Sequence, residues 1–218
     1  MPDRISCKAI IFDFDGTLAD SMPFLERIGV AVMMKYHGVT HEEATWRYRT
    51  TTGLPYEQQV KINFPGHEKN DMAIKEFEAL KIQRIYEQSL FPDTVSALME
   101  LKGMGLDLFV SSSTFQSTIT EYFKRRSLGF LFRDIMGYRP GFEKGAHHFN
   151  YVKNTYGLQL DHVVFVGDSI KDYERSRGFC PFVGMVGMVR EDDFRAAGHT
   201  GPVVRQLSDV PGLVTVRV

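Results

Sequence analysis

Residues 10–17 read Ile-Ile-Phe-Asp13-Phe-Asp15-Gly16-Thr17, an apolar run that changes into two carboxylates, a glycine and a threonine. The nearly unbroken apolar run over residues 8–14 is typical of a strand buried on both faces of a parallel sheet. Carboxylates are rarely buried without a partner. Two of them spaced i, i+2 at the end of a strand can hold a hard cation and share acid–base work. The stretch therefore predicts a parallel-sheet protein with an acidic site near its start.

Composition places the chain among globular proteins and narrows its partners. Its 218 residues are 43% hydrophobic and 24% charged, enough for one large domain or for a core with a small accessory domain. The net charge is −1, from 26 basic and 27 acidic residues, which gives no electrostatic reason to expect nucleic acid or an anionic membrane.

Targeting and cysteine content indicate a reducing compartment. No apolar run approaches the roughly 20 residues that span a bilayer, and Met1-Pro2-Asp3-Arg4 lacks a signal-peptide pattern. The two cysteines, Cys7 and Cys180, lie far apart and without metal-type spacing. We therefore expect a cytoplasmic protein with both thiols in packing roles.

Residues 19–91 contain helical signals and no convincing strand. Ser21 followed by Pro23 predicts a helix start, and Gly38 predicts its end. Thr40 with Glu43 fits a capping box for a second helix, Pro55 opens a third, and residues 70–90 read as one long helix. We expect an all-helical insertion over 19–91 and a core formed by 1–18 and 92–218.

Beyond residue 91, predicted strands alternate with predicted helices. This alternation predicts an α/β fold, a doubly wound parallel sheet of the Rossmann-like type covered by helices on both faces. The expected strands cover 107–110, 134–138, 162–166, 181–186 and 203–204, and the expected helices cover 94–104, 116–126, 144–156, 170–177 and 192–197.

Polar clusters follow the predicted strands where ligands bind in open α/β sheets, beyond the carboxyl ends. Four carboxylates meeting there would repel one another without a cation, and an all-oxygen donor set suits Mg²⁺. A nearby hydroxyl and ammonium are suited to phosphoryl oxygens, which indicates phosphoryl transfer. The residues are Asp13, Asp15, Asp168 and Asp172 as carboxylates, Ser111 as the hydroxyl and Lys144 as the ammonium.

In order and spacing these motifs resemble those of the haloacid dehalogenase superfamily, in its group of phosphoglycolate phosphatase-like and β-phosphoglucomutase-like enzymes. The resemblance covers nearly the whole chain, and the helical insertion matches the helical cap of that group. The matching motifs are Asp13-Phe-Asp15-Gly16-Thr17-Leu18, Val110-Ser111, Lys144 and Val166-Gly167-Asp168-Ser-Ile-Lys-Asp172.

The resemblance implies a Mg²⁺-dependent phosphatase that hydrolyses a small-molecule phosphomonoester through an aspartyl-phosphate. Asp13 would attack phosphorus, and Asp15 would protonate the leaving oxygen and then activate water. The implied Mg²⁺ ligands are the Asp13 carboxylate, the Asp15 backbone carbonyl and Asp168, with Asp172 as a further ligand or directly behind the ligands. The phosphoryl oxygens would contact Ser111 and Lys144, with Gly16, Thr17 and Ser112 shaping the turns and their N–H donors.

The third motif departs from the usual Lys-Pro of the group. The segment contains both Arg139 and Lys144, and the spacing of Lys144 to the following helix makes it the better match, with Arg139 as the alternative. Thr114 reads as a helix cap. The pair His147-His148 lacks the i, i+4 spacing of a metal pair, so a helix surface or a core contact is expected.

Specificity is expected in the helical insertion, where caps of the group approach the substrate. Arginines there could bind a carboxylate or a second phosphate, although a solvated surface explains each of them equally well. The candidates are Arg47, Arg49, Thr52 and Gly53.

Other functions compatible with the same residues remain open. A sugar phosphomutase of the β-phosphoglucomutase type would keep the whole core site, and a phosphonate-cleaving relative would need a cap lysine where Tyr56 stands. A dehalogenase is disfavoured by the presence of Asp15, and a non-catalytic binding protein by the complete acidic set. The expected partner is a small phosphorylated metabolite, and the chain is expected to be a monomer or a homodimer.

Overall fold

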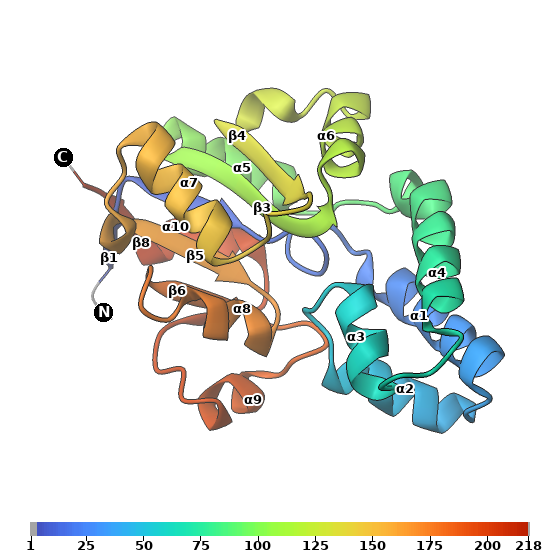
Figure 1. Ribbon diagram of the computed structural model, residues 1–218. Helices are drawn as coiled ribbons and strands as arrows, with labels where there is room; N and C mark the ends of the chain where they lie inside the picture. The colour runs from blue at the N-terminus through green and yellow to red at the C-terminus, as the bar shows by residue number, and fades with distance from the viewer. Residues whose placement is uncertain (1–3, 218) are drawn as a thin grey trace. The chain divides into compact units, whose positions relative to one another are not determined.

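The computed structural model describes residues 4–217, which divide into two compact units (Figure 1). One unit is the helical segment Asp20–Ser89, and the other combines the residues before it with those from Leu90 onward. Within residues 4–217, no helix has both the length and the apolar character needed to cross a lipid bilayer.

A six-stranded parallel sheet forms the centre of the larger unit, in the order β4-β3-β2-β5-β6-β7. The predicted α/β fold with a parallel sheet is confirmed. All four residues of β2 are fully buried, as expected for a strand covered on both faces. The strands are β2 (Ala9–Phe12), β3 (Asp107–Phe115), β4 (Asp134–Tyr138), β5 (Val163–Gly167), β6 (Phe182–Met185) and β7 (Val203–Val204).

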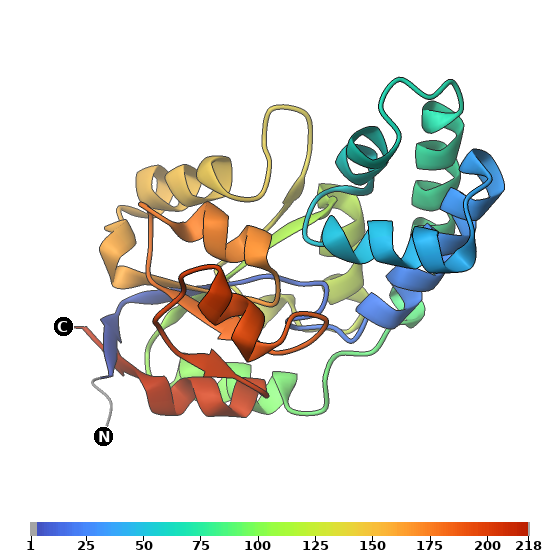
Figure 2. The same cartoon turned by 90° about the horizontal axis from the view of Figure 1, so that it is seen from below.

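Helices lie on both faces of this sheet. Figure 2 shows α7 and α8 on one face and α5 and α10 on the other. On the α7 face, Ile11, Phe109 and Phe165 pack with Phe149 and Val152 in one buried apolar cluster. The helices are α5 (Thr94–Gly103), α6 (Gln116–Arg125), α7 (Ala146–Tyr156), α8 (Ile170–Ser176), α9 (Glu191–Ala196) and α10 (Val210–Leu213).

The register of the central strands determines where the site forms. Phe12 of β2 pairs with Val110 of β3 on one side and with Val166 of β5 on the other. The residues that follow these three, Asp13, Ser111 and Gly167, therefore lie level with one another at the carboxyl end of β2.

Two short strands were not predicted from the sequence. β1 (Ile5–Cys7) and β8 (Val214–Val216) pair in parallel as a separate two-stranded sheet. The strand expected over residues 8–14 is β2, Ala9–Phe12, whereas β1 was not expected and is separated from β2 by a bend at Lys8. Three-residue strands carry too little alternation to be recognised without their distant partner.

β3 is also longer than expected and runs through the hydroxyl-rich segment to Phe115. Ser111, Ser112 and Thr114 are buried, although their composition reads as a turn. The pairing with β4 shifts register between Ser111 and Phe115, so the strand is irregular where its polar side chains lie.

The helical unit consists of α1 (Met22–His37), α2 (His41–Thr50), α3 (Tyr56–Asn63), α4 (Asn70–Arg84) and a 3-10 turn at Ile85–Glu87. Its predicted start at Ser21 and stop at Gly38 are confirmed, with Gly38 in the left-handed region at φ 67°. The Thr40 hydroxyl accepts the Glu43 N–H at 3.2 Å. The predicted helix over 70–90 was too long, because it changes to a 3-10 turn after Arg84.

Aromatic side chains hold the helical unit together. Tyr56 stacks on Phe77 with 3.7 Å between ring centroids, and its hydroxyl donates to the Gly29 carbonyl at 3.0 Å. A β-carbon at Gly29 would lie 2.5 Å from the Tyr48 ring, so only glycine permits this approach of α1 to α2.

Candidate active site

Asp13 and the turn behind it follow directly from β2. The Phe14 carbonyl accepts the N–H groups of Thr17, Leu18 and Ala19, which folds the chain back sharply after the strand. Gly16 has a φ of 85°, a conformation that side-chain-bearing residues rarely adopt. The turn keeps Asp13 and Asp15 at the carboxyl edge of the sheet.

Three carboxylates converge at this edge. Asp13, Asp168 and Asp172 each offer an oxygen within 4.8 Å of the others, and all three residues are buried. Lys144 Nζ lies 2.7 Å from Asp13 Oδ1 and 2.6 Å from Asp172 Oδ1. The ammonium therefore bridges two of the three carboxylates.

The charges of this cluster are incompletely balanced. Burial raises the pKa of Asp13 to about 6 despite the opposing charge of Lys144. Burial, together with the charges of Asp13 and Asp172, raises the pKa of Asp168 well above its usual range. Although burial opposes the charged form, Asp13 and Asp172 hold the pKa of Lys144 above its usual value. Three buried carboxylates share one buried ammonium, with the Arg175 guanidinium 3.7 Å from Asp172 at their edge, and this arrangement favours an additional cation.

Asp168 has the atom best suited to that cation. Its Oδ2 is buried and has no hydrogen-bond partner among residues 4–217, whereas Oδ1 accepts from the Thr17 hydroxyl at the long distance of 3.5 Å. An unsatisfied buried carboxylate oxygen beside two further carboxylates is a hard-oxygen donor set, which fits a divalent metal ion.

Asp172 is held from several sides at the start of α8. Its Oδ2 accepts from the Ser169 hydroxyl at 2.7 Å, while Oδ1 contacts Lys144 and lies 3.7 Å from Arg175 Nη1. A β-carbon at Gly167 would lie 2.7 Å from that of Asp172, so the motif requires glycine there. Asp172 is thus placed to orient Lys144 as well as to face the acidic cluster.

Asp15, two residues after Asp13, also meets a side chain from β3. Its Oδ2 accepts a hydrogen bond from the Thr114 hydroxyl at 2.8 Å. Thr114 does not begin a helix as the sequence suggested: it lies within β3, and its N–H donates to Ser112 Oγ at 3.0 Å. No local sequence pattern marks a contact between residues so far apart in the chain.

Ser111 also has a partner that the sequence left unassigned. Its Oγ lies 2.8 Å from Nδ1 of His148, and both residues are fully buried. Of the two positions expected for His148, on the helix surface or in the core, the structure shows the buried one. The sequence feature that could have predicted a role for His148 is its four-residue spacing from Lys144, which places both side chains near the start of α7.

The two candidates for the third motif lie in different surroundings. Lys144 is buried against Asp13, whereas the exposed Arg139 lies over the Phe142 ring at 4.4 Å. Lys144 is therefore the cation that belongs to the acidic cluster.

The candidate residues of the helical unit have contacts of their own. Arg47 pairs with Glu43 at 2.8 Å, donates to the Asn63 carbonyl at 2.7 Å and lies over the Phe64 ring at 4.8 Å. The Thr52 hydroxyl donates to the Tyr48 carbonyl at 3.1 Å. Gly53 adopts a φ of 90° in the turn before α3.

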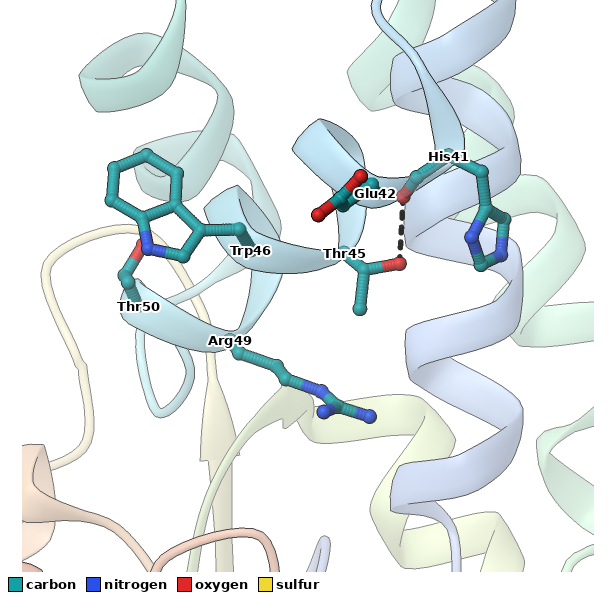
Figure 3. A pocket seen from close by; sticks show the side chains of 6 residues that line it. All are labelled: His41, Glu42, Thr45, Trp46, Arg49 and Thr50. Carbon is teal, nitrogen blue, oxygen red and sulfur yellow. Dashed lines mark hydrogen bonds between the residues drawn. The ribbon is translucent and has the colours of Figure 1, made fainter.

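Arg49 lines a surface hollow on α2, shown in Figure 3 with His41, Glu42, Thr45, Trp46 and Thr50. Its side chain is 62% exposed and pairs with Glu26 at 2.8 Å. The Thr45 hydroxyl donates to the His41 carbonyl at 2.8 Å, as Figure 3 shows. This hollow has a single carboxylate among the residues that line it, so it lacks the donor set of the sheet edge.

Known proteins are similar to this chain in sequence and in fold. Residues 10–179 match the family model described as haloacid dehalogenase-like hydrolase. Two proteins named phosphoglycolate phosphatase are similar in sequence. The one from Aliivibrio fischeri is 26% identical, over 78% of this chain and 79% of that protein. The one from Synechococcus elongatus is 28% identical, with the same coverage of both chains.

A crystal structure from Clostridium acetobutylicum, described as a predicted phosphatase, has a similar fold. It superposes with a TM-score of 0.82 at 19% identity, covering 95% of this chain and 97% of that one. At this identity the likeness concerns the fold alone.

Proposed function

Since the chain belongs to the haloacid dehalogenase-like hydrolase family, we propose that it is a Mg²⁺-dependent phosphatase that hydrolyses a small-molecule phosphomonoester through an aspartyl-phosphate. The observation that carries the proposal is the Asp13 carboxylate, buried at the end of β2 with Lys144 Nζ at 2.7 Å. A buried carboxylate beside a fixed ammonium and further carboxylates is a combination that phosphoryl transfer uses.

The first half-reaction is assigned to Asp13 and Asp15. Asp13 Oδ attacks phosphorus, the bond from phosphorus to the ester oxygen breaks, and Asp15 gives its proton to the leaving oxygen. Ser111 and Lys144 contact the phosphoryl oxygens, whose charge the Lys144 ammonium offsets.

The second half-reaction regenerates the enzyme. Asp15, now a carboxylate, takes a proton from water as the water oxygen attacks phosphorus. The bond from phosphorus to Asp13 then breaks and inorganic phosphate leaves. The contact from Thr114 to Asp15 supports this role because it fixes the carboxylate against β3, the strand beside the one that leads to Asp13.

The metal proposal rests on the donor set. Asp13, Asp168 and the backbone carbonyl of Asp15 would hold Mg²⁺, with Asp172 beside them. When bound, the ion supplies positive charge that offsets the phosphoryl oxygens and the crowded carboxylates.

The helical unit Asp20–Ser89 is proposed as the cap that selects the substrate. Arg49 is a better candidate for a substrate contact than Arg47, since Arg47 is already engaged by Glu43, Asn63 and Phe64. The two relatives named phosphoglycolate phosphatase make 2-phosphoglycolate the first compound to test.

The test of the mechanism is the Asp13→Asn variant with an aryl phosphate and Mg²⁺. We expect hydrolysis to be lost while the circular dichroism spectrum and melting temperature stay close to those of the wild type. Removal of metal with EDTA should also abolish turnover, and added Mg²⁺ should restore it. Undiminished hydrolysis by the folded variant would exclude Asp13 as nucleophile.

Substrate identity needs a panel of phosphorylated metabolites with phosphate release as the readout. Release of inorganic phosphate without a bisphosphate activator supports a phosphatase and excludes the phosphomutase alternative. Isomerisation of a sugar phosphate without net release would favour the phosphomutase.

A further inference from the structure

His148 is a buried imidazole whose contact the proposed mechanism leaves unused. It lies in the first turn of α7, fully buried, with Nδ1 at 2.8 Å from Ser111 Oγ. The Phe142 ring lies 4.4 Å from the imidazole, centroid to centroid. The ring is therefore enclosed by protein rather than directed to solvent.

The location of His148 links it to the phosphoryl-binding residues. Lys144 and His148 are four residues apart at the entry to α7, and they reach two different strands. Lys144 contacts Asp13 after β2, whereas His148 contacts Ser111 in β3. One short segment thus supplies both the ammonium of the site and the partner of its hydroxyl.

The imidazole is suited to a fixed role rather than to proton transfer. Burial, together with the nearby charge of Lys144, lowers the pKa of His148 to about 3. A neutral ring can make one stable hydrogen bond at Nδ1 over the ordinary pH range.

A serine hydroxyl rotates about its C–O bond and has one proton with two lone pairs. Unless one of its bonding directions is fixed, it loses orientational freedom each time it meets a ligand. The 2.8 Å contact with Nδ1 fixes one bonding direction of the Ser111 hydroxyl. Its other bonding directions then keep a constant orientation relative to β3.

We propose that His148 is a positioning residue that holds the Ser111 hydroxyl in the orientation that meets the phosphoryl group. This inference rests on the proposed function, in which Ser111 contacts a phosphoryl oxygen. In this proposal His148 acts on the substrate through Ser111 alone.

The experiment compares side chains that keep or remove the contact at Nδ1. The amide of asparagine reaches about as far as Nδ1, whereas the amide of glutamine reaches as far as Nε2. We expect His148→Leu to lower kcat/KM for an aryl phosphate by about tenfold, the effect of losing one hydrogen bond. His148→Asn should stay within about threefold of the wild type, and His148→Gln should resemble the leucine variant.

Coupling to Ser111 separates positioning from a general packing effect. In the Ser111→Ala background, His148→Leu should change kcat/KM by less than about twofold, because the hydroxyl to be oriented is gone. An undiminished effect in that background, or full activity of His148→Leu in the wild-type background, would overturn the proposal. If the leucine variant does not fold, the ranking of asparagine above glutamine decides the question.

His147→Leu is the matched control, since His147 is the exposed neighbour on the same helix turn and should leave activity unchanged. The dissociation constant of inorganic phosphate, measured by calorimetry with Mg²⁺, provides a readout independent of turnover. If the wild type binds phosphate but hydrolyses no ester, the proposed function fails. The positioning role of His148 is then tested by phosphate affinity, which should rank the variants in the same order. If the wild type neither binds phosphate nor hydrolyses an ester, both proposals fail.

Discussion

Thr114 donates a hydrogen bond from its hydroxyl to Asp15 Oδ2 at 2.8 Å, a contact between residues 99 positions apart in the chain. Thr114 is 2% exposed and lies in the irregular part of β3, so its side chain has little freedom to turn elsewhere. The contact joins the turn after β2 to the neighbouring strand. It therefore limits where the proposed acid–base group can point.

Thr114→Val should lower kcat more than it alters KM for an aryl phosphate. Valine keeps the volume but removes the hydroxyl that orients Asp15, and misalignment of an acid–base group acts mainly in the transition state. We expect a fall in kcat of about tenfold, the effect of losing one hydrogen bond. Steady-state kinetics at saturating Mg²⁺ measures it.

Thr114→Ser is the matched control because it keeps the hydroxyl and removes only a methyl group. It should retain kcat within about threefold. Equal losses in both variants would indicate a packing defect and not a lost contact with Asp15.

Lys144→Met should destabilise the protein in the absence of metal. It removes the one ammonium that bridges Asp13 and Asp172 and leaves buried carboxylates uncompensated. Breaking such a pair typically lowers the free energy of unfolding by about 3 kcal/mol. Urea denaturation in EDTA measures the loss, and millimolar Mg²⁺ should recover part of it because a bound cation replaces the missing charge.

Lys171→Met is the control for this prediction. Lys171 pairs with Glu174 on the surface, with 38% and 46% of the two side chains exposed. Its loss should cost less than about 1 kcal/mol and should not respond to Mg²⁺. A Lys144→Met variant as stable as this control would contradict the electrostatic account of the cluster.

The two arginines of α2 should differ in their effect on stability. Arg47→Met removes the pair with Glu43, the bond to the Asn63 carbonyl and the contact with Phe64, so we expect a loss of about 1 to 2 kcal/mol. Arg49→Met removes one exposed pair with Glu26 and should change stability by less than about 0.5 kcal/mol. Thermal and urea unfolding of both variants test this order.

The parallel sheet and most helix boundaries could be predicted because local physical signals determine them. The apolar run of β2 and the stop at Gly38 follow from burial and from backbone conformation at single positions. β1 and β8 could not be predicted, since each has three residues and pairs with a strand at the other end of the chain. The extension of β3 to Phe115 was not predicted, because a run of serine and threonine is typical of a turn although these side chains are mostly buried here.

The sequence predicted which residues form the acidic cluster, but it did not predict the side-chain contacts around them. The position of Asp13 and Asp168 after neighbouring strands follows from parallel topology, whatever the side chains do. The pairing of Ser111 with His148, and of Asp15 with Thr114, depends on side-chain directions at the irregular end of β3. Sequence spacing does not predict side-chain directions when the two partners belong to different strands or helices.

His148 should make the protein less stable as the pH falls below the ordinary pKa of histidine. The folded state keeps the imidazole neutral, with its pKa lowered to about 3 by burial, whereas the unfolded chain takes up a proton near the ordinary histidine pKa of 6.5. The unfolded state therefore binds more protons between these values, and the stability present above pH 6.5 is lost on acidification. Linkage gives about 2 kcal/mol lost between pH 7 and pH 5 from this group alone.

The measurement is urea denaturation of the wild type and of His148→Asn at pH 7 and at pH 5. Other groups, including the buried His199, titrate alike in both proteins, so the difference between the two pH responses isolates His148. We expect the asparagine variant to lose about 2 kcal/mol less than the wild type over this interval. Equal losses would mean that the imidazole is protonated in the folded protein, and a neutral ring could then no longer be assigned to the contact with Ser111.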